Sequence, residues 1–327
     1  MVKKNRRIVV IGGGTGSSVV LKGLKRYNVD IATIVPMTDS GGSTGKLREQ
    51  FGVLATGEIR QRLIALSGED EISKLLAKLL DYRFEKGELA GHNFGNIFLV
   101  ALTELLGSEK KAIEVASKIL KIKGRIIPST FDNVELVAEY SDGRKVVGEH
   151  FIDEPEKDGK IIKLYTEPEA KANVEAIKAI KNSDLIVIGP GDLYTSILAN
   201  FVVKGISEAV VKSKAKKVYI CNLMTSFGET IGMNVQDHIN EIEKYIGEKV
   251  LDYVIVNSGK IPEYAIVAGR KEPVKIFIDE KTKKRIKVIA KNLLSKKIYV
   301  KPRADVLERS MILHDPKKLG KILYSLK

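Results

Sequence analysis

The sequence predicts an α/β protein with a Rossmann-like, mostly parallel sheet, helices on both faces and a small antiparallel β insertion. Three observations indicate this fold. Short apolar, β-branched runs alternate with amphipathic stretches, polar glycine-rich loops follow several of those runs, and one segment carries a hairpin pattern instead. We expect a single domain over residues 1–327, with the insertion at 125–165. A hydrophobic content of 44% is enough for a substantial core.

The parallel sheet is predicted from five apolar runs: Ile8–Ile11, Ile31–Val35, Leu185–Ile188, Lys217–Cys221 and Tyr253–Asn257. Helical periodicity predicts the helices Val19–Arg26, Ile59–Ser67, Ile72–Leu80, Ile97–Leu106, Ala112–Leu120, Asn173–Lys181 and Val235–Ile246. Near-continuous apolar strands separated by helices are typical of a sheet covered on both faces. A last helix is expected after Asp315, which can cap it, with Pro316 at its first position.

The insertion is predicted from alternating runs around a turn. Its strands are expected at Val134–Tyr140, Lys145–His150 and Ile161–Tyr165, and the Asp142-Gly143 pair between the first two is a strong hairpin signal. Two looser segments, Val274–Ile278 and Arg285–Ile289, also have the composition of strands.

Composition limits the classes of function. The net charge is +14, but lysines are spread along the chain among glutamates, and tryptophan is absent, so we expect no nucleic-acid binding. The single cysteine, Cys221, excludes an internal disulfide and favours a cytoplasmic location. The apolar run after the basic N-terminus is too short for a signal peptide or a membrane span. A homodimer is expected because it is the commonest assembly.

The first glycine loop, Gly12–Ser18, follows the first strand and precedes a helix, which is the layout of a phosphate cradle. We expect ligand contacts from Gly13, Gly14, Thr15, Gly16 and Ser17. The dinucleotide fingerprint G-x-G-x-x-G is not met, because Ser17 stands where its third glycine belongs. This departure disfavours an NAD-type oxidoreductase. A purely structural strand-to-helix turn is the alternative.

The second strand ends in Asp39-Ser-Gly-Gly-Ser-Thr-Gly45, which can form a second anion-binding nest. The expected ligand contacts here are Asp39, Ser40, Gly42 and Ser43. A flexible turn capped by Ser43 or Thr44 is the alternative. Two further polar clusters lie at predicted helix starts and add Arg60, His92, Asn93 and Asn96.

The strand Leu185–Ile188 leads into another glycine-rich loop, and the last two strands of the sheet also end in polar residues. From these strand ends the predicted ligand contacts are Gly189, Gly191, Asp192, Leu193, Tyr194, Thr195, Ser196, Asn222, Met224 and Asn257. In a doubly wound sheet such loops meet at the carboxyl edge, where ligands bind. Asp39 and Asp192 are candidates to hold Mg²⁺ together with phosphate oxygens. No residue pattern identifies a catalytic nucleophile or general base.

Taken together, these motifs resemble the CofD-like superfamily, and most closely its gluconeogenesis-factor (YvcK-type) branch. The segments that carry the resemblance are Gly12–Gly16, Asp39–Arg48, Gly57–Arg60, Phe84–Asn96, Gly189–Leu198, Cys221–Thr225 and His314–Pro316. The resemblance implies a Rossmann-like fold and binding of UDP-sugars such as UDP-N-acetylglucosamine. It also implies a role in gluconeogenic growth, cell shape and cell-wall precursor supply, with no settled catalytic activity.

Two hypotheses remain open at this point. The first is a nucleotide-sugar-binding regulatory protein of the gluconeogenesis-factor type. The second is a Mg²⁺-dependent phosphotransferase, because another branch of the superfamily is represented by 2-phospho-L-lactate transferase. Ser40 stands where the family usually has a second acid, which puts metal-dependent transfer in doubt.

Overall fold

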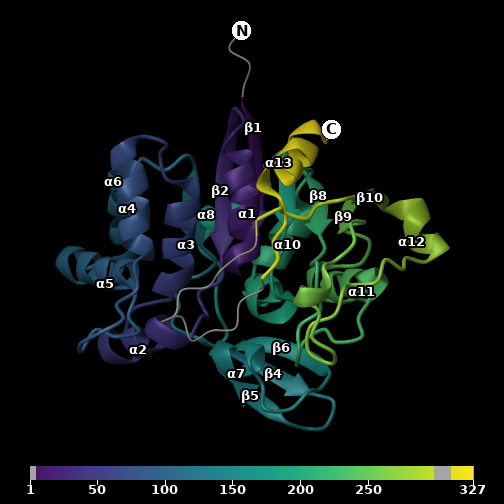
Figure 1. The fold of residues 1–327 in the computed structure, drawn as a ribbon, viewed down its shortest axis with the longest axis horizontal. Helices are drawn as coiled ribbons and strands as arrows, with labels where there is room; N and C mark the ends of the chain where they lie inside the picture. The colour runs from purple at the N-terminus through teal and green to yellow at the C-terminus, as the bar shows by residue number, and fades with distance from the viewer. Residues whose placement is uncertain (1–4, 298–310, 327) are drawn as a thin grey trace.

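The computed structural model describes residues 5–297 and 311–326. Its centre is a seven-stranded sheet of order β10-β9-β8-β7-β1-β2-β3, and every neighbouring pair runs parallel (Figure 1). The strands are β1 (Arg6–Ile11), β2 (Val29–Val35), β3 (Arg125–Pro128), β7 (Leu185–Ile188), β8 (Lys216–Ile220), β9 (Tyr253–Asn257) and β10 (Lys287–Lys291).

Helices cover both faces of this sheet. Along β1, Ile8 and Val10 belong to one hydrophobic core and Val9 and Ile11 to the other, which is why the strand reads as continuously apolar. The first core is shared with α1 (Gly14–Leu24), α3 (Thr56–Leu66), α5 (Phe94–Leu106), α6 (Glu109–Ile119) and α13 (Pro316–Ser325). The second is shared with α8 (Val174–Lys181), α10 (Ile206–Lys212) and α11 (Val235–Ile246).

Other helical segments lie around these layers: α2 (Gly42–Phe51), α4 (Glu71–Asp81), a π-helical turn at Leu193–Leu198 continued by α9 (Ala199–Phe201), a 3₁₀ turn at Glu263–Ala265, and α12 (Glu280–Arg285). The last helix, α13, begins after Asp315, whose carboxylate accepts hydrogen bonds from Lys317 and Lys318 N–H. The predicted cap of that helix is confirmed.

The first and last helices of the chain make an unusually close contact. Gly23 of α1 faces Gly320 of α13, and a Cβ added at Gly320 would lie 2.6 Å from the carbonyl oxygen of Gly23. A Cβ added at Gly23 would collide with the carbonyl oxygen of Pro316. The two helices therefore touch backbone to backbone, which only glycine permits.

The antiparallel insertion forms a second sheet of order β5-β4-β6, at the bottom of Figure 1. Its elements are β4 (Glu135–Tyr140), β5 (Lys145–Val147), α7 (Glu149–Asp153) and β6 (Ile161–Glu167). Leu136, Ile152 and Leu164 are buried in the same core as one face of the main sheet. The predicted fold class, with this small antiparallel insertion, is confirmed.

Three details of the prediction are corrected. Arg125–Pro128, counted in the insertion, is β3 and pairs with β2, so the antiparallel part begins later. Lys145–His150 is a strand only to Val147, because Gly148 at φ 101° turns the chain into α7. Val274–Ile278 is not a strand: its backbone groups bond to the loop after β8 and to the start of α11 rather than to a neighbouring strand.

The order of strands reverses at β1, which lies between β7 on one side and β2 on the other. The loops after β1 and β7 therefore face each other at the carboxyl edge, and this topological switch is where such sheets bind ligands. Within the described residues no helix is both long and apolar enough to cross a membrane.

Candidate functional site

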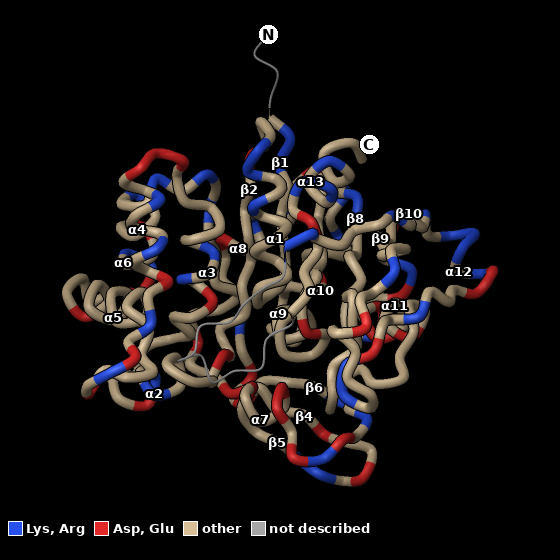
Figure 2. The backbone as a smooth tube through the Cα atoms, in the orientation of Figure 1, with Lys and Arg blue, Asp and Glu red and all other residues tan. Residues whose placement is uncertain are grey.

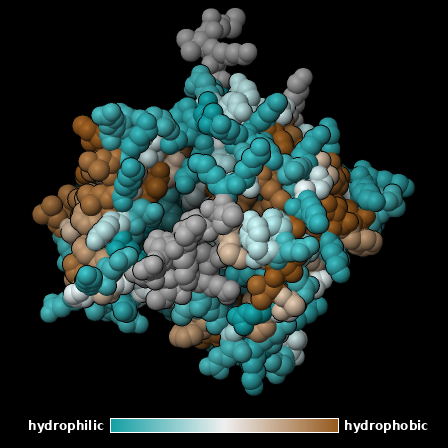
Figure 3. Space-filling view, viewed as in Figure 1, coloured by the Kyte–Doolittle hydropathy of each residue, from teal (hydrophilic) through white to brown (hydrophobic). Residues whose placement is uncertain are grey.

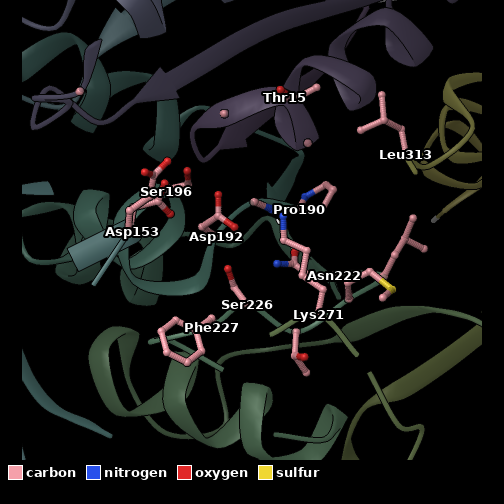
Figure 4. A pocket seen from close by; sticks show the side chains of 18 of the residues that line it. Thr15, Asp153, Pro190, Asp192, Ser196, Asn222, Ser226, Phe227, Lys271 and Leu313 are labelled. Carbon is pink, nitrogen blue, oxygen red and sulfur yellow. Dashed lines mark hydrogen bonds between the residues drawn. The ribbon is translucent and has the colours of Figure 1, made fainter. Parts of the chain in front are cut away.

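A pocket of about 410 Å³ lies at the topological switch, between the loops after β1 and β7. Figure 4 shows Thr15 on one side of it, Asp192 and Asn222 in the middle, and Ser226 and Phe227 on the opposite side. Of the residues predicted from sequence, those that line this pocket are Gly14, Thr15, Gly16, Asp39, Gly191, Asp192, Ser196, Asn222 and Met224.

The first glycine loop is held from behind by a buried ion pair. Arg62 is fully buried, pairs with Glu58 at 2.9 Å, and donates to the Gly14 carbonyl at 2.8 Å and to Ser18 Oγ at 2.6 Å. Glu58 in turn accepts from Gly14 N–H at 2.9 Å. One donor of the predicted phosphate cradle is thus already bound to a carboxylate of the protein.

The next two donors of that cradle remain available. Thr15 and Gly16 line the pocket, and among residues 5–297 and 311–326 their backbone N–H groups donate to no acceptor of another loop or side chain. They belong to the first turn of α1, where the helix dipole also favours negative charge. This turn can therefore hold an anionic group of a ligand.

The loop after β7 is arranged in a similar way. Glu229 accepts from Thr195 Oγ1 at 2.9 Å, from Thr195 N–H at 3.3 Å and from Tyr194 N–H at 3.4 Å. Burial raises the pKa of the Glu229 carboxyl well above its ordinary value, and the nearby charges of Asp192 and Asp153 raise it further. Leu193, Tyr194 and Thr195 begin the π-helical turn, are buried and do not line the pocket, whereas Asp192 and Ser196 do.

The insertion supplies another wall of the pocket through α7. Ser40 Oγ accepts from His150 N–H at 3.2 Å, which ties the loop after β2 to this helix. Burial raises the pKa of the Glu149 carboxyl well above its ordinary value, and the charges of Asp39 and Asp153 add to the effect. Glu149 and Asp153 were missed because a strand was predicted across the first turn of α7.

Five predicted residues form a separate polar cluster between α2, α3 and α5 and do not line the pocket. Arg60 Nε donates to Asn96 Oδ1 at 3.1 Å, and Asn96 Nδ2 donates to Ser43 Oγ at 3.3 Å. Ser43 Oγ also lies 3.3 Å from His92 Nδ1, while Asn93 caps α5 through Gly95 N–H. Each of these side chains therefore has a protein partner, and the bonds to Ser43 position the N-terminus of α2.

The remaining predicted residues serve the loops themselves. Ser17 Oγ donates to the Pro190 carbonyl at 3.1 Å, linking the two glycine loops. Asn257 binds both the N–H and the carbonyl of Gly259 and accepts from Leu293 N–H, so its amide shapes the turn after β9. Gly13 is the N-cap of α1, Gly189 adopts φ 71°, and Gly42 starts α2 at φ 48°.

Acidic side chains dominate the pocket. The lining carboxylates are Asp39, Glu58, Glu149, Asp153, Glu154 and Asp192, against the cationic Arg270 and Lys271. Figure 2 shows acidic segments near α7, at the carboxyl edge of the central strands. Nevertheless, in the part of the chain that the structure describes, no three His, Cys, Asp or Glu side chains form a metal-binding group. The residues thus fit a magnesium ion only in the mode that uses one or two carboxylates plus ligand phosphates.

The pocket is also lined by residues that the sequence did not single out as contacts. His314 is 5% exposed, bonds to the backbone of Cys221, and has no partner for Nε2 among the described residues. Burial lowers the pKa of its imidazole to about 4, so the ring is neutral at physiological pH. Arg270 lies 4.6 Å from the centre of the Phe227 ring, and both line the pocket.

Residues 8–294 match the family model described as 2-phospho-L-lactate transferase CofD. The chain belongs to the CofD family. It is 39% identical over 327 residues to the gluconeogenesis factor of Bacillus subtilis, covering 98% of each chain. It is 41% identical over 291 residues to the gluconeogenesis factor of Listeria innocua, covering 88% of this chain and 89% of that one.

A solved structure of a UPF0052 family protein from Bacillus halodurans has the same fold. It superposes with a TM-score of 0.87 at 35% identity, over 99% of this chain and all of that one. Within the CofD family, the chain is therefore of the gluconeogenesis-factor type, as the resemblance in the sequence indicated. The match from residue 8 to 294 includes the pocket lining from Gly14 to Lys271, while Ile312, Leu313 and His314 lie beyond it.

Proposed function

We propose that this protein binds a nucleotide-sugar of the UDP-sugar class, such as UDP-N-acetylglucosamine, and acts as a regulatory protein rather than through catalysis of its own. The binding would link carbon metabolism to cell shape and cell-wall precursor supply, in the cytoplasm. The observation that carries the proposal is the first turn of α1, whose Thr15 and Gly16 N–H groups face the pocket without an acceptor among the described residues.

The acidic lining requires a cation if the ligand carries a diphosphate. Glu58 is paired with Arg62, and burial raises the pKa of the Glu149 carboxyl. The other carboxylates of the lining, Asp39, Asp153, Glu154 and Asp192, still outnumber Arg270 and Lys271 and would repel a dianion at close range. We therefore propose that Mg²⁺ accompanies the ligand, held by Asp39 or Asp192 together with the phosphate oxygens. Bound there, the ion would neutralise the diphosphate and the carboxylates at once.

Isothermal titration calorimetry with UDP-N-acetylglucosamine, with and without Mg²⁺, tests both parts. We expect binding that Mg²⁺ strengthens at least tenfold, and a smaller Mg²⁺ effect in Asp192→Asn. Asp30→Asn, a similar change outside the pocket, should behave as the unmodified protein. The absence of heat and of a thermal shift at millimolar ligand would overturn the proposal.

A phosphotransferase of the 2-phospho-L-lactate type is the second candidate, favoured by the family description. In that case Asp39 and Asp192 would orient a metal-bound diphosphate, and Lys271 would stabilise charge on the transferred group. Incubation with a nucleotide-diphosphate conjugate of phospholactate, Mg²⁺ and a deazaflavin acceptor, followed by mass spectrometry, tests it. Intact nucleotide binding without product would leave the regulatory function.

We further propose that two copies pair through an apolar surface on α4, the α4 surface. It consists of Ile72, Leu75, Leu79 and Tyr82, which are 67%, 66%, 42% and 52% exposed. Their spacing of three or four residues puts them on one side of the helix, and Ser73 and Leu80 are the only buried residues within α4. Figure 3 shows hydrophobic residues gathered on this side of the molecule.

An antiparallel pairing of two α4 helices about Ala77 is self-complementary. Ile72 then faces Tyr82 of the second copy, and Glu71 faces Arg83 of the second copy, a pairing of opposite charges. Size-exclusion chromatography with light scattering should find a dimer. Leu75→Glu should give a monomer, and Val174→Glu, equally exposed on α8, should not. An unmodified protein that stays monomeric at about 50 µM would contradict the pairing, because a dimer with a micromolar Kd forms at that concentration.

A further inference from the structure

A second cavity of about 430 Å³ lies next to the pocket, at the carboxyl ends of β8 and β9. The two spaces share Asn222 and Leu223 in their walls. Unlike the pocket, the second cavity is mostly apolar, with walls formed by side chains such as Val235, Val256 and Ile261. Lys260 is the only charged residue among its described lining.

The two spaces differ in the chemistry that they favour. The pocket combines carboxylates, cationic side chains and helix N–H groups, which suits a charged group with a cation. The second cavity offers apolar contact with few polar groups, which suits an uncharged planar ring. A nucleotide conjugate has both parts, joined by a ribose.

The sheet topology sets the direction of such a ligand. With its phosphates at the switch between β1 and β7, the ligand can extend over β8 to β9, because these strands follow β7 in the sheet. The other direction, towards β2, leads to Asp39 and to Glu149 on α7, where an uncharged ring would meet half-buried carboxyl groups.

Asn222 stands at the junction between the two spaces. Its Oδ1 accepts from Gly191 N–H at 3.1 Å, which fixes the orientation of the amide. Its Nδ2 has no acceptor among the described residues, so two N–H donors are available where a ribose or a ring carbonyl would pass. In Asn257, by contrast, both the Nδ2 and the Oδ1 atoms hydrogen-bond to Gly259 in the turn after β9.

We propose that the second cavity receives the heteroaromatic ring of the nucleotide conjugate whose diphosphate occupies the pocket, with Asn222 donating to the ligand between them. This inference rests on the proposed function and adds the placement and orientation of the ligand.

The test uses the absence of tryptophan from the chain. Ile276 lines the second cavity and is 48% exposed, so Ile276→Trp would place a single fluorescent indole at its rim. Val267→Trp, 43% exposed and outside both linings, is the matched control. UDP-N-acetylglucosamine with Mg²⁺ should quench Ile276→Trp by ring stacking and leave Val267→Trp unchanged. Magnesium pyrophosphate, which has no ring, should quench neither.

A blocking variant gives an independent readout. Val274→Trp would fill the second cavity, and we expect it to weaken UDP-N-acetylglucosamine at least tenfold while pyrophosphate affinity changes less than twofold. If calorimetry shows that the unmodified protein binds the ligand, two results would overturn the inference and leave the proposed function standing. One is no quenching of Ile276→Trp, and the other is an unchanged affinity in Val274→Trp. Absence of binding to the unmodified protein would overturn both.

Discussion

His314 should make the stability of this protein depend on pH in a predictable window. The imidazole is almost fully buried, and burial lowers its pKa from 6.5 to about 4. The unfolded chain takes up a proton at His314 as the pH falls below 6.5, whereas the folded protein resists protonation until about pH 4. The stabilisation from the neutral ring is therefore complete above pH 6.5 and is lost as the pH falls through the folded pKa.

The magnitude follows from the two pKa values. A pKa difference of 6.5 minus 4 corresponds to about 3 kcal/mol in total at 1.36 kcal/mol per unit, of which about 2 kcal/mol is lost by pH 5. Glu149 and Glu229 act in the opposite sense, because their raised pKa values favour the folded state at low pH. The profile of the protein alone would mix these contributions.

The assay compares the protein with His314→Asn by urea unfolding, monitored by circular dichroism from pH 8 to 5. The asparagine amide can take the place of Nδ1 and keep a donor to the Cys221 carbonyl. The carboxyl contributions cancel when the unfolding free energy of the unmodified protein is subtracted from that of His314→Asn. This difference should shift by about 2 kcal/mol in favour of the variant between pH 8 and 5. A difference that stays constant within about 0.5 kcal/mol would refute the reasoning.

Three further predictions concern the loops. Arg62→Met should cost about 3–5 kcal/mol in urea unfolding, because the buried Glu58 carboxylate loses its ion pair with Arg62, and adding Glu58→Gln should recover part of the loss. Gly16→Ala should lower the melting temperature and abolish nucleotide binding in calorimetry, because its Cβ would lie 2.6 Å from the Pro190 carbonyl oxygen; unchanged binding would disprove the close contact. Glu229→Gln should become more stable relative to the unmodified protein as the pH rises from 4.5 to 8, because folded Glu229 retains a proton that the unfolded chain releases. Unfolding free energies of the two proteins that change in parallel with pH would contradict this.

The fold was predictable because its strands and helices have strong sequence patterns. The strands Leu185–Ile188 and Tyr253–Asn257 and the helix Val235–Ile246 have the predicted bounds. Continuous apolar runs and strong amphipathic periodicity are compatible with few other structures. The failures lie where short-range pattern is weak. At Gly148 one positive φ ends a strand, and this cannot be read from alternation alone.

The candidate site was only partly predictable for a different reason. Glycine loops identify backbone N–H donors, but they do not show which of these donors bond to an acceptor elsewhere in the protein. Glu58 lies 44 residues from Gly14, and Glu229 lies 34 residues from Thr195. Both carboxylates reach the loops only through the tertiary fold. Sequence spacing near the loops therefore cannot show that some of their N–H groups already donate to a carboxylate of the protein. The donors that remain, on Thr15 and Gly16, are the ones that matter for the proposed function.

The contact between Gly23 and Gly320 has a consequence for synthesis of the chain. The ribosome makes α1 long before α13, so the face of α1 that α13 covers stays open until α13 has been synthesised. The helix that begins at the first glycine loop is therefore fully packed only when α13 reaches it. A nascent chain stalled before Pro316 should expose this surface of α1 to chaperones, and a bulky group attached to α13 would act on the same helix that carries the proposed phosphate contacts.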